Sequence, residues 1–308
     1  MSELFHRPVL LNEVVKYLIT NREGVYLDGT LGLGGHAERI LQILVPPGRL
    51  IGIDRDEQAL RAARDRLKQF QNLTLLKLHF GQMEELTQLC GVEQLNGIFL
   101  DLGLGSWQIS LPERGFSYLK EGPLDMRMDK SQKLSAQDVV NSYSLQALTR
   151  IFTEYGEERL SKKIAKKIIE ARREIYTTSR LAAIIAEAVP GRYRIKTLSR
   201  IFQALRIEVN RELEELRSAL TKAPDLVRIG GRIGIISYHS KEDRLVKKSF
   251  QELSKKCICP PDSPVCTCGG NARWRLITRK PVVPSSRETD ENPSARSAKF
   301  RVIERIAA

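Results

Sequence analysis

The chain has 308 residues, of which 42% are hydrophobic and 28% charged, a composition typical of a soluble globular protein with room for two hydrophobic cores. Lys and Arg outnumber Asp and Glu by 50 to 37, and the net charge of +13 favours a polyanionic partner such as nucleic acid over a merely basic enzyme. No apolar run approaches the roughly 18 residues of a membrane span, and the first residues lack a secretory pattern, so we expect a cytoplasmic protein without a membrane partner.

The first hundred residues alternate short apolar strands with helices. The expected strands cover residues 24–28, 49–54, 73–79 and 97–101. The expected helices between them cover residues 36–44, 57–70 and 84–90. Nearly continuous apolar strands separated by helices are typical of a parallel sheet that is buried on both faces. The sequence therefore predicts an α/β fold with a doubly wound, mostly parallel sheet.

The middle of the chain, from about residue 135 to residue 222, is expected to be helical. Ser135 and Thr177 have the residue type and position of helix caps. Residues 157–174 form an amphipathic pattern, and residues 198–220 are expected to form one long helix.

Strand patterns resume after these helices. The expected strands cover residues 232–237, 273–278 and 299–306. The helices therefore interrupt one sheet rather than follow it. We expect a discontinuous sheet domain of residues 1–110 and 222–308, with an inserted all-helical domain of residues 111–221 that recognises the substrate.

A glycine-rich turn joins the first expected strand to the first helix and reads Asp28-Gly-Thr-Leu-Gly-Leu-Gly-Gly-His36. Ligands of open α/β sheets bind at the carboxyl ends of the strands, and glycines there let the backbone approach a ligand. The turn also fits the G-x-G-x-x-A pattern of dinucleotide sites. A third alternative is a tight turn that binds nothing.

Acidic residues end the first two strands. Asp28 would face a pyrophosphate badly but suits the positively charged amino-acid end of S-adenosylmethionine. Asp54 can accept hydrogen bonds from both hydroxyls of a ribose, which fits S-adenosylmethionine and NAD equally. The structural alternative for either carboxylate is to cap the following helix.

Asp101 ends the fourth strand and opens a loop that runs through Gln108. If the ligand is S-adenosylmethionine and the methyl acceptor is a base amine such as that of cytosine, the acceptor is a poor nucleophile because its lone pair is delocalised into the ring. A carboxylate that accepts a hydrogen bond from the N–H group of this amine would reduce the positive charge that develops on the nitrogen as a methyl group is transferred to it. Asp101 is the candidate catalytic residue, and the alternative is that it only orders the loop.

Eight strings occur in one order along nearly the whole chain. They are GTLGLGGH (29–36), IGIDRD (51–56), LDLG (100–103), ERGFS (113–117), GPLDMRMD (122–129), EYGEER (154–159), FQALRIEVN (202–210) and ISYHSKEDR (236–244). Together they resemble the bacterial 16S rRNA cytosine-N4 methyltransferase family.

This resemblance implies a class I methyltransferase domain, Rossmann-like, with a helical insertion. It also implies that S-adenosylmethionine is the cofactor and that the substrate is the N4 amine of a decoding-centre cytidine in 16S rRNA of the small ribosomal subunit. The residues that match cofactor-binding positions of the family are Gly34, Gly35, His36, Asp54, Asp101 and Gln108. No metal is expected at this site.

The chain departs from the family after the third strand, where an aromatic residue is usual. Simple alignment puts Gln82 at this cofactor-binding position, and Phe80 is the alternative that could cover the adenine. The serine pair that often follows LDLG is here Gly105-Ser106, and a His-Pro-Ala stretch is replaced near Ile195.

Several polar residues have two interpretations. His36 either contacts the cofactor or packs against the sheet. Tyr238 and His239 either bind a flipped-out cytosine or precede a helix that Ser240 caps. The segment 125–129 either walls the target pocket or forms a structural ion-pair loop.

Basic residues gather in the helical region and are either an RNA-binding surface or a solvated face. They are Lys162, Lys163, Lys166, Lys167, Arg172, Arg173, Arg192, Arg194, Lys196 and Arg200.

Late in the chain, Cys257, Cys259, Cys266 and Cys268 could hold a structural zinc ion, but their C-x-C spacing is unusual and no metal is assigned.

Two other functions compete with the methyltransferase hypothesis. One is an NAD(P)-dependent oxidoreductase that uses the same glycine turn, and the other is a non-catalytic RNA-binding ribosome-assembly factor. The sequence leaves the oligomeric state open, with a homodimer as one alternative.

Overall fold

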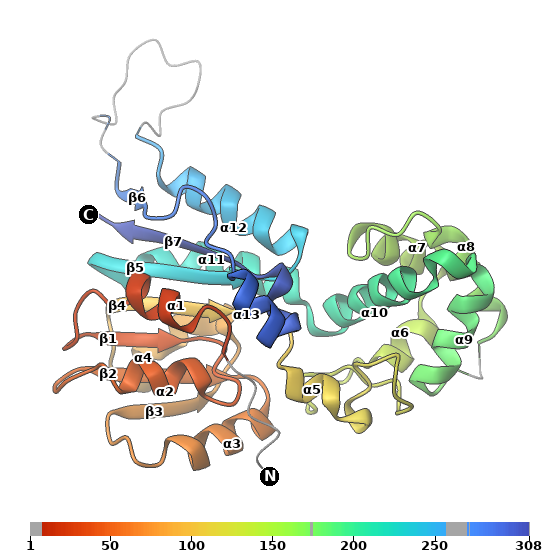
Figure 1. Ribbon diagram of the computed structural model, residues 1–308, viewed down its shortest axis with the longest axis horizontal. Helices are drawn as coiled ribbons and strands as arrows, with labels where there is room; N and C mark the ends of the chain where they lie inside the picture. The colour runs from red at the N-terminus through yellow and green to blue at the C-terminus, as the bar shows by residue number, and fades with distance from the viewer. Residues whose placement is uncertain (1–7, 173–174, 257–269, 271, 308) are drawn as a thin grey trace. The chain divides into compact units, whose positions relative to one another are not determined.

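The computed structural model describes residues 8–172, 175–256, 270 and 272–307, and it divides into two compact units. The sheet unit comprises Met1–Gly103 and Glu214–Ala308, and the helical unit comprises Leu104–Leu213 (Figure 1). The domain boundaries expected from sequence, after residues 110 and 221, each lie seven or eight residues beyond the boundaries of these units.

The sheet unit is built on seven strands in the order β3-β2-β1-β4-β5-β7-β6. The strands are β1 Val25–Asp28, β2 Arg49–Asp54, β3 Leu73–Lys77, β4 Leu95–Asp101, β5 Val227–Ser237, β6 Trp274–Leu276 and β7 Lys299–Arg305. Neighbours from β3 to β5 pair in parallel, whereas β7 is antiparallel to both β5 and β6. The predicted α/β fold with a mostly parallel sheet is confirmed.

Helices cover both faces of this sheet (Figure 1). They are α1 Leu11–Leu18, α2 Gly35–Leu41, α3 Glu57–Leu67, α4 Leu86–Cys90, α11 Glu212–Leu226, α12 Ser240–Leu253 and α13 Ser286–Glu291, with turns η1 Phe80–Glu85 and η4 Pro293–Ser297. Successive residues of β1 alternate between the two cores: Tyr26 packs in the cluster with α1 and α2, and Leu27 packs in the cluster with α11 and α12. The sheet is therefore doubly wound.

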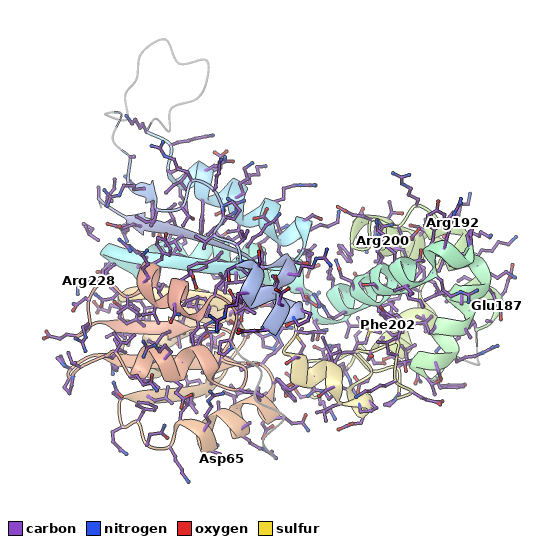
Figure 2. All side chains as sticks on the ribbon, in the orientation of Figure 1. Asp65, Glu187, Arg192, Arg200, Phe202 and Arg228 are labelled. Atoms are coloured by element: carbon purple, nitrogen blue, oxygen red, sulfur yellow. The ribbon has the colours of Figure 1, made fainter. Side chains whose placement is uncertain are left out.

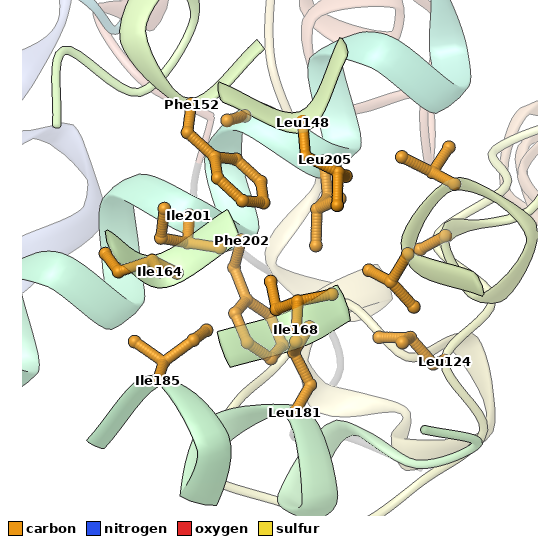
Figure 3. Packing of buried hydrophobic residues seen from close by; sticks show 14 of the residues in the cluster. Leu124, Leu148, Phe152, Ile164, Ile168, Leu181, Ile185, Ile201, Phe202 and Leu205 are labelled. Carbon is orange, nitrogen blue, oxygen red and sulfur yellow. The ribbon is translucent and has the colours of Figure 1, made fainter. Parts of the chain in front are cut away.

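The helical unit has its own hydrophobic core. Its helices are α5 Ser106–Ser110, α6 Ala136–Ser142, α7 Leu145–Glu154, α8 Ser161–Glu170, α9 Thr178–Ala188 and α10 Arg194–Asn210, with turns η2 Pro112–Arg114 and η3 Gly191–Tyr193. Figure 3 shows Phe152, Ile168 and Phe202 packed among aliphatic side chains from several of these helices. The predicted caps are confirmed, because Ser135 accepts the amide of Asp138 and Thr177 accepts that of Arg180.

The prediction of one long helix over residues 198–220 is wrong. The helix α10 begins earlier, at Arg194, and ends at Asn210, and α11 starts at Glu212. Between them Arg211 has a positive φ of 51°, a conformation that ends an α-helix and that non-glycine residues rarely adopt. A bidentate ion pair between Arg206 and Glu212 spans the break, with both N···O distances at 2.8 Å.

No helix among the described residues is both long enough and apolar enough to cross a bilayer.

Candidate active site

Three carboxylates end three neighbouring strands of the sheet. Asp28 is the last residue of β1, Asp54 of β2 and Asp101 of β4. Because these strands are parallel, their last residues meet at one edge of the sheet. The chain turns from β1 toward β2 and β3 on one side and reaches β4 on the other, so this edge is the switch point where open α/β sheets bind ligands.

The glycine turn lies across this edge and is tied to both neighbouring strands. The amide of Gly29 donates to the carbonyl of Phe99 in β4 at 2.9 Å, and the amide of Leu31 donates to Ile53 in β2 at 3.1 Å. Gly32 and Gly34 have φ values of 53° and 80°, where other residues would be strained. The turn is therefore fixed before any ligand binds.

Asp28 is 1% exposed, and its two carboxylate oxygens differ. Oδ1 accepts the amide of Thr30 at 3.2 Å, whereas Oδ2 has no hydrogen-bond partner among the described residues. Burial raises the pKa of this carboxyl from 3.8 to about 7, with further repulsion from Asp101 and Asp54. A buried oxygen without a partner is costly, and a cationic ligand group would compensate this cost.

Asp54 is bound to the turn it faces. Its Oδ2 accepts the amide of Gly32 and its Oδ1 accepts the amide of Asp56, each at 2.8 Å. Burial raises the pKa of Asp54 to about 6, against these two hydrogen bonds. The alternative that Asp28 or Asp54 caps a helix is wrong, because Gly34 precedes α2 and the side chain of Asp56 caps α3.

Asp101 is part of a hydrogen-bonded group at the end of β4. Its amide donates to Thr30 Oγ1 at 2.6 Å, and its Oδ1 accepts the hydroxyl of Tyr238 at 2.8 Å. Burial and the adjacent Asp101 raise the pKa of Tyr238 well above 10, so the phenol stays a donor. The carboxylate of Asp101 is thereby held in one orientation.

His36 lies beside this group and is 7% exposed. Its Nε2 donates to the carbonyl of Val9 at 2.9 Å, and its Nδ1 is 3.7 Å from Asp101 Oδ2. Its ring packs on Phe99 with centroids 4.8 Å apart. Burial lowers the pKa of His36 to about 4, so the imidazole is neutral at physiological pH. His36 packs against the sheet, as one of its two interpretations expected, and its contact with a cofactor stays a prediction.

The segment after β3 carries the two candidates for the adenine position. The side chain of Gln82 is exposed and its amide donates to Glu85 at 2.9 Å. Phe80 is partly buried against the core beneath it, with the guanidinium carbon of Arg55 6.0 Å from its ring centroid. The geometry favours Phe80 as the residue that can present an apolar ring.

Gln108 belongs to the helical unit and is 6% exposed. Its Oε1 accepts the amide of Gly105 at 3.1 Å, which closes the first turn of α5. The predicted role of Gln108 in cofactor binding is not tested by this contact within its own unit.

Comparisons with known proteins identify the family. A family model described as the MraW methylase family matches residues 3–306. The chain belongs to the MraW methylase family. Ribosomal RNA small subunit methyltransferase H of Halothermothrix orenii is 46% identical over 308 residues, with 98% of this chain and 99% of the relative covered. The enzyme of the same description from Caldicellulosiruptor bescii is 47% identical over 304 residues, with the same coverage.

The solved structures that match this chain are more distant in sequence. A putative rRNA methylase from Clostridium thermocellum is 12% identical with a TM-score of 0.45, and the match covers 98% of this chain and 100% of that one. A putative methyltransferase from Streptococcus mutans in complex with SAH is 13% identical with a TM-score of 0.43, covering 96% and 95%. The family resemblance expected from the eight sequence strings is confirmed by the family model and the close relatives.

Two further residues of this MraW-family chain have structural roles that the sequence left open. The alternative that Ser240 caps α12 is wrong, because His239 is the N-cap and its Nδ1 accepts the amide of Glu242 at 3.4 Å. Tyr238, one of the candidates for binding a flipped-out cytosine, donates to Asp101, and its contact with a base stays a prediction. The pairing of β5 with β4 brings Tyr238 beside Asp101, and the sequence alone does not indicate this pairing.

The segment 125–129 forms a structural loop within the helical unit. Arg127 makes a bidentate ion pair with Asp125, with N···O distances of 2.6 and 3.0 Å. Met126 is fully buried in the unit's core, and Asn210 hydrogen-bonds the backbone of Met126 and Met128 at 2.8 Å each. An ion pair and buried hydrogen bonds therefore order this loop within the helical unit, and a role of the segment as a wall of the target pocket stays a prediction. The four late cysteines, Cys257, Cys259, Cys266 and Cys268, lie outside the described residues.

Proposed function

We propose that this protein transfers a methyl group from S-adenosylmethionine to the N4 amine of a decoding-centre cytidine in 16S rRNA. Membership of the methylase family, with relatives described as rRNA small subunit methyltransferases along the whole chain, supports the reaction and the RNA substrate. The observation that carries the cofactor assignment is the buried, unpartnered Oδ2 of Asp28 at the head of the glycine turn. A diphosphate would be repelled there, whereas an ammonium group would be bound.

The residues of the sheet edge fit the parts of this cofactor. Asp28 would receive the amino-acid end, Asp54 the ribose hydroxyls and Phe80, rather than Gln82, the adenine. Gly34, Gly35 and His36 would border the amino-acid end, and Gln108 is the further cofactor-binding residue that the family resemblance implies. S-adenosylmethionine, when bound, would supply an electrophilic methyl group on its sulfonium. The side chains of the site would bind the cofactor and orient this methyl group.

Asp101 would act on the amine. Methylation of the N4 nitrogen requires the loss of one N–H proton, and a carboxylate that accepts this N–H bond favours the attack. Tyr238 supports this role because its hydroxyl orients Asp101 Oδ1. Because the imidazole of His36 is neutral, it does not compete as a cation with the substrate amine for the carboxylate of Asp101.

The helical unit would recognise the RNA in the cytoplasm, where ribosomal subunits are assembled. Residues 191–196 are all exposed and combine three cations, Arg192, Arg194 and Lys196, with the half-exposed ring of Tyr193. Arg192 lies at the surface of this unit (Figure 2), with its guanidinium carbon 4.8 Å from the Tyr193 centroid. Cations beside an aromatic ring suit phosphates and an unpaired base.

Calorimetry with S-adenosylhomocysteine and with NAD tests the cofactor assignment. We expect binding of S-adenosylhomocysteine and no heat with NAD, and the opposite result would support an oxidoreductase. Tritiated S-adenosylmethionine with small subunits that lack the modification then tests catalysis. Binding of the cofactor without any tritium label in rRNA would indicate that the protein is a non-catalytic assembly factor.

A further inference from the structure

The segment that carries Phe80 is held by one helix. The turn η1 hydrogen-bonds along α11, since Ser218 Oγ and Lys222 Nζ both donate to the carbonyl of Gly81, at 2.8 and 2.7 Å. Lys222 also contacts Glu84. The carbonyl of the residue after Phe80 is therefore fixed by two side chains.

Glu215 of the same helix contacts both neighbours of Phe80. Its Oε1 is 3.7 Å from His79 Nδ1. A Cβ atom built on Gly81 would lie 2.1 Å from Glu215 Oε2, so the carboxylate packs closely against this glycine. Burial alone would raise the pKa of Glu215, but its interaction with His79 and the charge of Arg55 hold the pKa below its ordinary value.

The group also reaches the end of β2. Arg55, which interacts with the Glu215 charge, follows the ribose-binding candidate Asp54 and lies 6.0 Å from the Phe80 ring centroid. Phe80 is thus flanked in sequence by two residues that touch Glu215, and its ring is flanked in space by a third. One carboxylate therefore lies against both chain neighbours of Phe80 and interacts electrostatically with the cation beside the ring.

Packing of the helix does not need this carboxylate. Leu216 and Ala219 are each 1% exposed in the core beneath the sheet and anchor α11 there. Glu215 is only partly buried, so its contacts with η1 are additional to the hydrophobic anchoring. Its contribution therefore concerns the conformation of residues 79–81 more than the stability of the fold.

We propose that Glu215 is a positioning residue that holds Phe80 in the conformation that covers the adenine of the cofactor. This inference rests on the proposed function. Glu215 does not touch the reacting atoms, so its loss should change the affinity for the cofactor and leave the chemical step unchanged.

The test compares Glu215→Gln with Glu214→Gln, a neighbouring exposed glutamate of the same helix that undergoes the same change of charge. Calorimetry with S-adenosylhomocysteine should show about tenfold weaker binding for Glu215→Gln, because the carboxylate charge that interacts with His79 and Arg55 is lost, and little change for Glu214→Gln. The KM for S-adenosylmethionine should rise by a similar factor at nearly constant kcat. Ser218→Ala, which removes one of the two donors to the Gly81 carbonyl, should show a smaller effect of the same kind.

A double-mutant cycle separates positioning from general destabilisation. In a Phe80→Leu background the further effect of Glu215→Gln on S-adenosylhomocysteine affinity should largely vanish, because the ring that Glu215 orients is absent. Equal effects in both backgrounds, or wild-type affinity of Glu215→Gln and Ser218→Ala, would overturn the inference. Failure of the wild-type protein to bind S-adenosylhomocysteine would instead contradict the proposed function.

Discussion

Replacement of Asp28 by Asn should make the ligand-free protein more stable and the cofactor complex weaker. The carboxyl is 1% exposed and its Oδ2 has no partner among the described residues. Burial raises its pKa from 3.8 to about 7. Asn keeps an oxygen for the amide of Thr30 and removes the ionisable group, so the change isolates the cost of the charge.

The size of the effect follows from the two pKa values. A difference of about 3 units, at about 1.4 kcal/mol per unit, makes the ionised carboxylate about 4 kcal/mol unfavourable to folding above pH 7. Because the folded-state pKa is the higher one, the folded protein binds the extra proton between about pH 4 and pH 7, and stability falls as the pH rises through that range. The Asp28→Asn protein lacks this loss.

Urea unfolding of both proteins at about pH 5 and about pH 8 measures the difference. The stability advantage of Asp28→Asn should grow by up to about 3 kcal/mol between these conditions, since most of the titration lies between them. Binding of S-adenosylhomocysteine at the higher pH should weaken by about tenfold or more, because the ligand's ammonium group loses a charged partner. A pH-independent difference in stability together with unchanged binding would refute the reasoning.

Three other variants test the site and the RNA surface. Asp101→Asn should bind S-adenosylhomocysteine like the wild type while kcat falls by about a hundredfold or more, and full turnover would remove Asp101 from catalysis. Tyr238→Phe keeps the ring and loses the hydroxyl, so kcat should fall by a smaller factor, about tenfold, with an unchanged Kd for S-adenosylhomocysteine; an unchanged kcat would show that the 2.8 Å contact does not orient Asp101. Combined Arg192→Ala, Arg194→Ala and Lys196→Ala should lower the slope of log affinity for rRNA against log salt by about two to three, and an identical slope would exclude this surface.

The sequence predicted the acidic strand ends because buried parallel strands have a simple pattern. Asp28, Asp54 and Asp101 each follow an apolar run, and each is the last residue of its strand. Parallel pairing then brings them to one edge without further information. The glycine turn and the caps at Ser135 and Thr177 were predictable for a similar reason, since local backbone geometry selects these residue types.

Contacts between distant segments were not predictable in this way. The bond from Tyr238 to Asp101 joins residues 137 positions apart and requires β5 to lie beside β4. No glycine or proline marks the break at Arg211 in the sequence. The ion pair that spans this break is a feature of the folded chain. Simple alignment predicts that Gln82 lies at the adenine position. The exposure of Gln82 and its hydrogen bond to Glu85 depend on how η1 folds, which the alignment does not indicate.

Nucleoside mass analysis after reaction tests the central claim most directly. Small ribosomal subunits that lack the modification would be incubated with the protein and S-adenosylmethionine, and their 16S rRNA digested to nucleosides and to sequence-specific fragments. We expect one new methyl group, on the N4 nitrogen of a single cytidine in a decoding-centre fragment. A methyl group on a carbon or on a ribose oxygen would contradict the account. So would the absence of any new methyl group in rRNA when the protein binds both this rRNA and S-adenosylmethionine.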